Sequence, residues 1–98
     1  MINNAGISKP GMIFETDALQ NAKDNMDLNY FANVKMTSVV GKKMIERKNG
    51  RIVFVGSVCS YSCIPGLGGY QASKYAQRAF SDSIRYECEV HGVKVHLF

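Results

Sequence analysis

The sequence predicts an α/β fold in which strands and helices alternate, forming part of a doubly wound parallel sheet. Strand-like and helix-like patterns alternate along its 98 residues. The β-branched and aromatic run at 51–56 is typical of a strand buried on both faces, as in a parallel sheet. Because the connections are short, right-handed crossovers are expected to place successive strands side by side. The predicted order is a strand exit, a helix, a strand, a helix and a strand.

The N-terminal segment is predicted to leave a strand and then run as a loop. The first two residues are too few to form an element, but the Asn-Asn-Ala-Gly stretch at 3–6 looks like the exit from a strand. Residues 7–15 include a proline and a glycine, which indicate a loop. Thr16 or Asp17 could cap a short helix after it.

The rest of the chain is predicted to contain two long helices and two strands. In order, these are a helix over about 24–48, a strand over 51–56, a loop over 58–69, a helix over about 70–90 and a strand over 93–98. Apolar or small residues spaced three and four apart predict the helices. Ala72, Ala76 and Ala79 belong to a small-residue face that could approach another element closely. The strand at 51–56 is expected to lie in the middle of the sheet.

The composition excludes several classes of protein. With 46% hydrophobic and 20% charged residues, the chain is expected to be globular and not disordered. The net charge is +4, and no basic stripe with interleaved aromatic residues predicts nucleic-acid binding. No apolar run is long enough to cross a bilayer, so this segment is expected to be soluble. Three cysteines indicate free thiols in a reducing compartment, and the two histidines predict no metal site.

The chemistry is carried by a tyrosine and a lysine on one helix. Tyr70 and Lys74 lie one turn apart on the same face. A cation held close to a phenol stabilises the phenolate, which makes the phenol a usable proton donor or acceptor near neutral pH. Ser57, thirteen residues earlier at the end of a strand, could hold a carbonyl oxygen beside that phenol. These residues predict proton transfer coupled to hydride transfer at a carbonyl or alcohol.

Four motifs in order resemble those of the short-chain dehydrogenase/reductase family along the whole chain. They are the Asn-Asn-Ala-Gly stretch at 3–6, then Asn29, then Ser57, then Tyr70 with Lys74. The resemblance implies a Rossmann-like fold and an oxidoreductase. Each motif alone is weak, but together they stand on the expected elements.

The resemblance also implies a role for each catalytic candidate. Tyr70 would be the general acid in reduction and the general base in oxidation. Lys74 would stabilise its phenolate and bind the nicotinamide ribose. Ser57 would orient the substrate oxygen. Asn29 would hold a water that links Lys74 to solvent as a proton relay, although two further asparagines lie four residues to either side of it.

The cofactor residues follow from the same resemblance. Asn4, Ala5 and Gly6 would line the cofactor groove, together with Tyr70 and Lys74. The stretches at 25–30 and 50–55 are similar to 3-ketodihydrosphingosine reductases, which reduce a long-chain ketone with NADPH at the cytosolic face of the endoplasmic reticulum. This similarity favours NADP over NAD, a carbonyl or alcohol substrate that is a long-chain lipid, and a location in the cytoplasm or on that membrane face. Retinol and steroid dehydrogenases remain alternatives.

The sequence departs from the family at its beginning. Members start with a strand and a glycine-rich turn, T-G-x-x-x-G-x-G, which cradles the pyrophosphate. Nothing before Asn3 supplies that turn, so residues 1–98 are expected to be the catalytic part of a longer domain. The isolated chain is expected to be poorly stable and to bind cofactor weakly.

Two other hypotheses belong to different classes. A catalytically silent fragment could act only by association with a full-length relative, through the two long helices that would also form a homodimer. A thiol sensor could use Cys59 and Cys63 in the loop beside the tyrosine.

Overall fold

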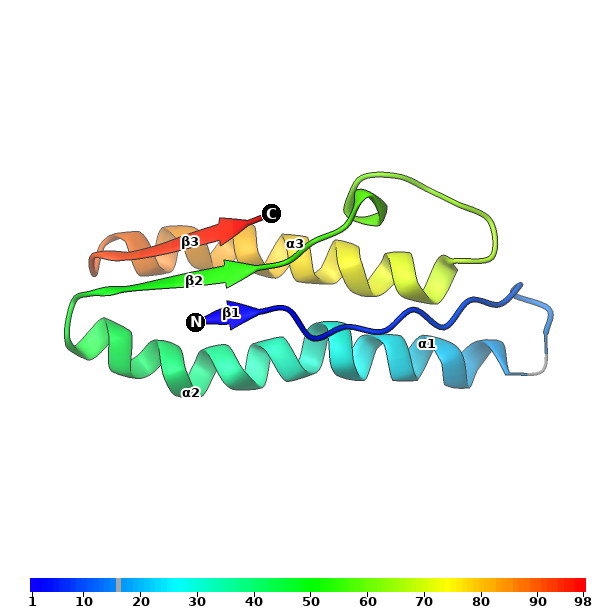
Figure 1. Cartoon of the computed structure of the whole chain (residues 1–98), viewed down its shortest axis with the longest axis horizontal. Helices are drawn as coiled ribbons and strands as arrows, with labels where there is room; N and C mark the ends of the chain where they lie inside the picture. The colour runs from blue at the N-terminus through cyan, green and yellow to red at the C-terminus, as the bar shows by residue number, and fades with distance from the viewer. Residues whose placement is uncertain (16) are drawn as a thin grey trace.

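The computed structural model describes residues 1–15 and 17–98 and shows a parallel sheet with long helices packed against it (Figure 1). In chain order the elements are β1 (Ile2–Asn3), α1 (Ala18–Met26), the π-helical turn η1 (Asp27–Phe31), α2 (Ala32–Glu46), β2 (Gly50–Phe54), the 3₁₀ turn η2 (Val58–Ser60), α3 (Gly68–Glu89) and β3 (Val93–Leu97). Both strand pairs are parallel and β2 lies between β1 and β3. The predicted fold class and strand order are confirmed.

The core lies on one face of the sheet. The apolar cluster comprises Met44, Ile52, Phe54, Ile84, Cys88, Val93 and Val95. Ile52 and Phe54 point to the same face of β2 and are fully buried against side chains of both α2 and α3. Both helices therefore cover this face, as right-handed crossovers require. Val53 and Val55, on the other face, are only half-buried. The prediction that this strand is buried on both faces is therefore met on one face only within the described part of the chain.

The first long helix begins earlier than predicted and contains a π-helical turn. α1, η1 and α2 follow one another without a gap, so a single helical path runs along the lower edge of the view in Figure 1. Asp17 precedes α1, but its side chain makes no capping hydrogen bond. Thr16, the other predicted cap, lies outside the described residues. The apolar spacing gave no signal for the π-helical turn.

The buried face of this helix is polar, which differs from the apolar rows in its sequence. Its buried side chains are Asn25, Asn29, Asn33, Thr37 and Met44. The first three lie four residues apart on one face. Of the apolar residues, Met36 and Phe31 are more than half exposed, whereas Val40 and Ile45 pack against the apolar core. Hydrogen bonds to backbone groups accompany the burial of the three asparagines, whereas the hydroxyl of Thr37 has no partner among the described residues.

α3 begins at Gly68, just before Tyr70 as predicted, and its N-terminal end approaches α1 closely. A Cβ atom placed on Gly69 would lie 2.8 Å from the Cα of Ala22, so glycine permits this contact between the helices. Ala72 and Ala79 of the predicted small-residue face are exposed. The buried face carries Gln71, Ser73, Lys74, Gln77 and Ser81, followed by Ile84 and Cys88. It is polar near the start of α3 and apolar near its end.

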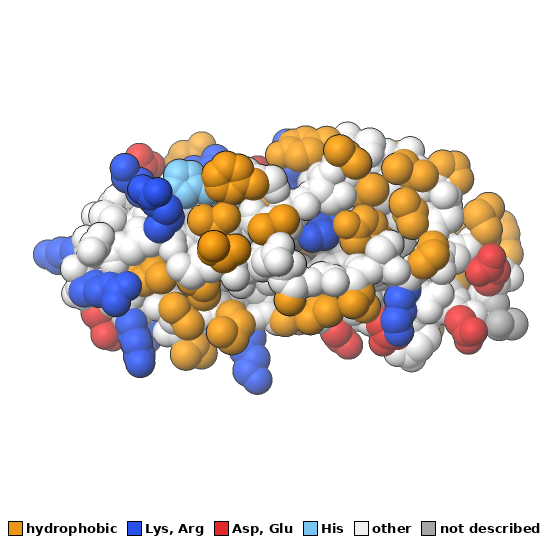
Figure 2. Space-filling model, in the orientation of Figure 1, with side chains coloured by type: hydrophobic (Ala, Val, Ile, Leu, Met, Phe, Trp, Pro, Cys, Tyr) orange, Lys and Arg blue, Asp and Glu red, His pale blue; other side chains and the backbone are white. Residues whose placement is uncertain are grey.

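The surface is cationic at one end and apolar at the outer strands. Figure 2 shows Lys and Arg side chains gathered at the left of the view, where α2 ends and β2 begins in Figure 1. Lys43 lies in the last turn of α2, where a cation complements the negative end of the helix dipole. Ile2 and Phe98 are 69% and 78% exposed at the outer strands, and exposed apolar edges of this kind favour association. None of the helices in the described residues is both long and apolar enough to cross a membrane.

Candidate active site

A polar pocket lies beyond the carboxyl end of β1, against the first turns of α3. Its volume is about 290 Å³, and it is lined by Asn4, Gly6, Ile7, Ser8, Tyr70 and Lys74. Ligands of open α/β sheets bind at this edge, outside the carboxyl ends of the strands. Four of the residues predicted from the sequence therefore share one pocket. Ala5, the fifth predicted cofactor residue, lines a neighbouring recess against the helix that contains Leu28 and Ala32.

Lys74 is a buried cation in this pocket. Its side chain comes from the second turn of α3, and the residue is only 5% exposed. Its Nζ donates to the backbone oxygen of Val55 at 3.2 Å and to Oε1 of Gln77 at 3.4 Å. Burial lowers the pKa of Lys74, because the charged form loses hydration. The hydrogen-bond partners of this ammonium group are thus two neutral oxygens, which replace its lost hydration only in part.

The ammonium group of Lys74 also lies beside Tyr70. The Nζ atom is 6.0 Å from the centroid of the phenol ring, and the two side chains project from successive turns of α3. Tyr70 is half-buried and lines the pocket. The phenol can therefore contact a ligand in the pocket, and the positive charge of Lys74 acts on it.

Asn29 connects three segments behind the pocket. It is fully buried at the middle of the π-helical turn. Its Oδ1 accepts from the backbone N–H of Ile7 at 2.9 Å, and its Nδ2 donates to the oxygen of Ile7 at 2.8 Å and to Oγ of Ser73 at 2.9 Å. π-helical turns inside α-helices are frequent at functional sites. The amide thereby joins the loop after β1 to α3.

Ser73 is a site residue that the sequence reasoning missed. Its hydroxyl accepts from Asn29 and donates to the backbone oxygen of Tyr70 at 2.6 Å. It is fully buried. Its position three residues after the tyrosine, on the same helical face, is the signal that could have identified it.

Ser57 lies outside this pocket, just after the end of β2. Its Oγ accepts from the backbone N–H of Cys59 at 3.1 Å, and its own N–H donates to Oγ of Ser60 at 3.2 Å. This reciprocal arrangement is a capping box for the 3₁₀ turn η2. A hydroxyl that accepts a hydrogen bond can still donate its proton to a second partner. The cap therefore fixes the position of Ser57 and leaves its hydroxyl able to act as a donor.

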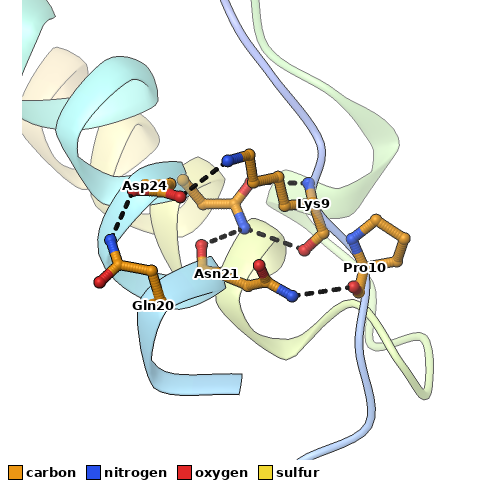
Figure 3. Close-up of polar contacts among 6 residues, drawn as sticks. Lys9, Pro10, Gln20, Asn21 and Asp24 are labelled. Carbon is orange, nitrogen blue, oxygen red and sulfur yellow. Dashed lines mark hydrogen bonds and ion pairs between the residues drawn. The ribbon is translucent and has the colours of Figure 1, made fainter. Parts of the chain in front are cut away.

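The segment that follows Gly6 is anchored to α1 by side chains (Figure 3). Asn25 accepts from the backbone N–H of Lys9 and donates to its oxygen, both at 3.1 Å, and Asn21 donates to the oxygen of Pro10 at 3.2 Å. The Lys9 ammonium pairs with Asp24 at 2.7 Å. This hydrogen bond lowers the pKa of Asp24, with a smaller effect from Gln20. The wall of the pocket from Ile7 onward is therefore held in one position.

Gly6 leaves the space in front of Asn29 and Lys74 open. A Cβ atom at this position would lie 3.2 Å from Oδ1 of Asn29 and 3.7 Å from Nζ of Lys74. The pocket is thus bounded by a backbone without a side chain, an amide, an ammonium group and a phenol. Such a donor set suits a ligand rich in hydroxyl groups.

The three cysteines do not line this pocket. Cys59 and Cys88 are buried, and Cys63 is exposed. Burial, and then the charge of Glu87, raise the pKa of the Cys88 thiol, which disfavours the reactive thiolate. Among residues 1–15 and 17–98, no three His, Cys, Asp or Glu side chains gather in a way that could hold a metal ion.

The chain is similar to known dehydrogenases and reductases. The chain is 42% identical over 95 residues to dehydrogenase/reductase SDR family member 7B of Mus musculus, which covers 97% of this chain and 29% of that protein. It is 35% identical over 95 residues to a 3-ketodihydrosphingosine reductase of Cryptococcus neoformans var. neoformans serotype D, covering 96% of this chain and 28% of the reductase. The chain thus spans less than a third of the length of these relatives.

Solved structures share the fold. The apo form of LigO from Sphingobium sp. strain SYK-6 superposes with a TM-score of 0.91 and 31% identity, over 99% of this chain and 36% of LigO. A gluconate 5-dehydrogenase from Burkholderia cenocepacia J2315, in complex with NADP and tartrate, gives a TM-score of 0.89 and 26% identity, over 98% of this chain and 37% of that one. The short chain dehydrogenase family model matches residues 1–98. The chain therefore belongs to the short-chain dehydrogenase family.

Proposed function

We propose that this chain carries the proton-transfer part of an NAD(P)-dependent oxidoreductase that acts on a carbonyl or an alcohol. The observation that supports this most is the buried ammonium of Lys74 beside Tyr70, in a pocket at the carboxyl edge of the sheet. A cation in a poorly hydrated site interacts more strongly with a developing phenolate than it would in water.

In the reduction direction, Tyr70 donates its phenolic proton to the substrate oxygen as the carbonyl carbon gains a hydride. The positive charge of Lys74 stabilises the phenolate that remains. Ser57 donates a hydrogen bond to the same substrate oxygen and keeps it beside the phenol. In oxidation each transfer runs backward, and Tyr70 accepts the proton of the alcohol. A bound nicotinamide cofactor supplies or accepts the hydride.

Proton supply to Tyr70 is assigned to the polar groups behind it. Asn29 holds a water between Lys74 and solvent, so that the proton donated to substrate is replaced. The hydrogen bonds from Asn29 to Ile7 and Ser73 support this role, because they fix its amide next to the pocket. Relay through an ordered water needs polar partners held in place.

The pocket residues fit the ribose end of a dinucleotide. Asn4, Gly6, Tyr70 and Lys74 would hold it, since they offer the amide, ammonium and hydroxyl groups that sugar hydroxyls require. NADP is favoured over NAD, and three solved relatives carry NADP in support. Residues 1–98 would form the catalytic part of a longer domain whose remaining segment binds the pyrophosphate. The short share of each relative that this chain covers supports that division.

The substrate class is a long-chain ketone, with 3-ketodihydrosphingosine as the first compound to test. Similarity to a 3-ketodihydrosphingosine reductase supports it. In the loop before α1, Ile13 and Phe14 are 75% and 97% exposed and offer apolar surface to such a chain. Such an enzyme would work in the cytoplasm or at the cytosolic face of the endoplasmic reticulum.

A homodimer through α2 and α3 is part of the same proposal. An apolar groove of about 350 Å³ between these helices, and the exposed Met36 and Val39 on α2, support it. Light scattering of the purified protein would measure the oligomeric state directly. A silent fragment that associates with a full-length relative would use the same face, so activity distinguishes the two functions.

The test is turnover of the full-length protein in which this chain would lie. NADPH consumption is followed with a panel of ketones that includes 3-ketodihydrosphingosine, for the parent, Tyr70→Phe and Tyr86→Phe. Tyr86 lies on the same helix but is 72% exposed, so its variant makes the same chemical change away from the pocket. We expect Tyr70→Phe to lose turnover while cofactor binding and Tyr86→Phe stay normal. Equal turnover in all three proteins would remove Tyr70 from the chemistry, and no turnover in the parent would favour the silent fragment.

A further inference from the structure

The loop that separates Ser57 from α3 is held by a buried amide next to Tyr70. Gln71 is 7% exposed in the first turn of α3. Its Oε1 accepts from the backbone N–H of Ile64 at 2.9 Å, and its Nε2 donates to the backbone oxygen of Ser62. The oxygen and the nitrogen of one side-chain amide thus each bond to a backbone group of the loop. Neither role is needed for the proton transfer assigned to Tyr70 and Lys74.

The loop is further tied on both sides of this clamp. Toward its start, the guanidinium of Arg78 lies 4.2 Å from the ring centroid of Tyr61 and donates to the oxygen of Ser60 at 3.4 Å. Toward its end, the N–H of Gly11 donates to the oxygen of Gly66 at 2.8 Å. This last bond connects the loop to the segment that continues from the pocket wall. The two loops are therefore joined directly by a backbone hydrogen bond.

Between the two loops lies a second hollow of about 320 Å³. It is lined by Pro10, Gly11, Met12, Glu15, Pro65, Gly66 and Leu67. Its shape depends on where the 62–67 part of the loop lies, and Gln71 is the buried side chain that holds that part. Arg78 is a weaker tether, because its side chain is 38% exposed and is shared with Asp82.

We propose that Gln71 is a positioning residue that fixes the 62–67 loop and so sets the shape of the substrate side of the site. The assignment rests on the proposed function. Without the amide, the backbone groups of Ser62 and Ile64 exchange their bonds for water and the loop samples other positions. Substrate then binds a site that is assembled only part of the time, which raises KM. Tyr70 and Lys74 keep their places in the helix, so kcat is retained.

The test compares Gln71→Met with Gln20→Met in the full-length protein. Methionine keeps the length of the side chain but can neither donate nor accept in this pattern. Gln20 lies on the surface of α1 and bonds only to Asp24 among the described residues, so its variant is a matched control. Loss of two hydrogen bonds is expected to raise KM for the ketone about tenfold in Gln71→Met, with kcat within about twofold of the parent. Gln20→Met is expected to match the parent in both constants.

Amide hydrogen exchange provides a measurement that does not depend on activity or on a variant. In the parent, the N–H of Ile64 is expected to exchange at least about tenfold more slowly than the N–H of Cys63 in the same loop. In Gln71→Met that protection is expected to disappear. Equal exchange at Ile64 and Cys63 in the parent would overturn the clamp even if the variant did not fold.

The outcomes separate this proposal from the function on which it rests. If Tyr70→Phe is inactive and Gln71→Met has an unchanged KM, the assignment of Gln71 is wrong and the proposed function stands. If kcat falls as much as KM rises, Gln71 acts on the chemistry and the positioning role is overturned. A parent without turnover on any ketone would overturn both.

Discussion

The side-chain amide of Asn29 is hydrogen-bonded to both backbone groups of Ile7, at 2.9 Å and 2.8 Å, across 22 positions of sequence. Asn25 makes the same pair of bonds with Lys9, one helical turn away. Alternate residues of an extended segment are spaced about 6.6 Å apart, close to the rise of four residues in a helix. The buried asparagines therefore act as a polar ladder that holds the pocket wall against the helix.

Replacing Asn29 with leucine is expected to lower the free energy of unfolding by about 2–4 kcal/mol. The change leaves the partly buried N–H and oxygen of Ile7 without their partner and removes the bond that the hydroxyl of Ser73 accepts, although this hydroxyl keeps its bond to Tyr70. Urea denaturation of the two proteins would measure the difference. Asn49→Leu in an exposed turn is the control and is expected to change stability by less than about 0.5 kcal/mol. A similar loss in both variants would contradict the ladder.

Lys74→Met is expected to abolish turnover and yet to stabilise the fold. Burial lowers the pKa of Lys74, so the folded state binds its proton less tightly than the unfolded state. At neutral pH the charged side chain therefore lowers the free energy of unfolding. This cost disappears only as the pH rises through the lowered pKa of the folded state toward the pKa of about 10.4 in the unfolded state. Removal of the buried charge is expected to outweigh the loss of the two hydrogen bonds to Val55 and Gln77 and to raise stability at neutral pH. Thermal unfolding at pH 7 checks this, and a lower melting temperature in the variant would argue against it.

Asp24→Asn is expected to weaken the fold at neutral pH but not in acid. The hydrogen bond from Lys9 lowers the pKa of Asp24 in the folded state. The pair therefore stabilises the fold above the unfolded value of about 3.9, and this contribution is lost as the pH falls through the folded value. The gap in urea midpoint between parent and variant should close in that acid range, and also in high salt, because both side chains are partly exposed. Asp17→Asn, at a position without a capping bond, serves as the control.

Gly69→Ala and Gly68→Ala are expected to have opposite effects, although the two glycines are neighbours in α3. A Cβ at Gly69 meets the backbone of Ala22 at 2.8 Å, so overpacking is expected to cost about 1–3 kcal/mol. A Cβ at Gly68 meets nothing within 4 Å, and alanine there should be neutral or slightly stabilising. Chemical denaturation of both single variants tests the close contact between α1 and α3. Equal stability of the two variants would show that the helices can separate without cost.

Periodicity in the sequence was enough to predict the elements and their order in the sheet. The β-branched run at 51–56 and the short connections require β2 to lie between its neighbours, and the structure confirms this arrangement. Tyr70 and Lys74 could be placed on one face of a helix because helical spacing is a local property. The resemblance to the family placed Asn4 and Gly6 with them, and the structure brings these four residues to one pocket.

Only the tertiary structure decided which polar side chains are buried. The apolar spacing predicted the first helix but not that its buried face carries Asn25, Asn29 and Asn33. Gln71 and Ser73 likewise gained their roles from partners that lie elsewhere in the chain. Buried backbone N–H and C=O groups must find partners, and loops without regular structure take them from nearby side chains. The spacing of residues in the sequence shows which of them share a helix face. Long-range contacts determine which of those faces is buried against the loops and supplies their hydrogen-bond partners.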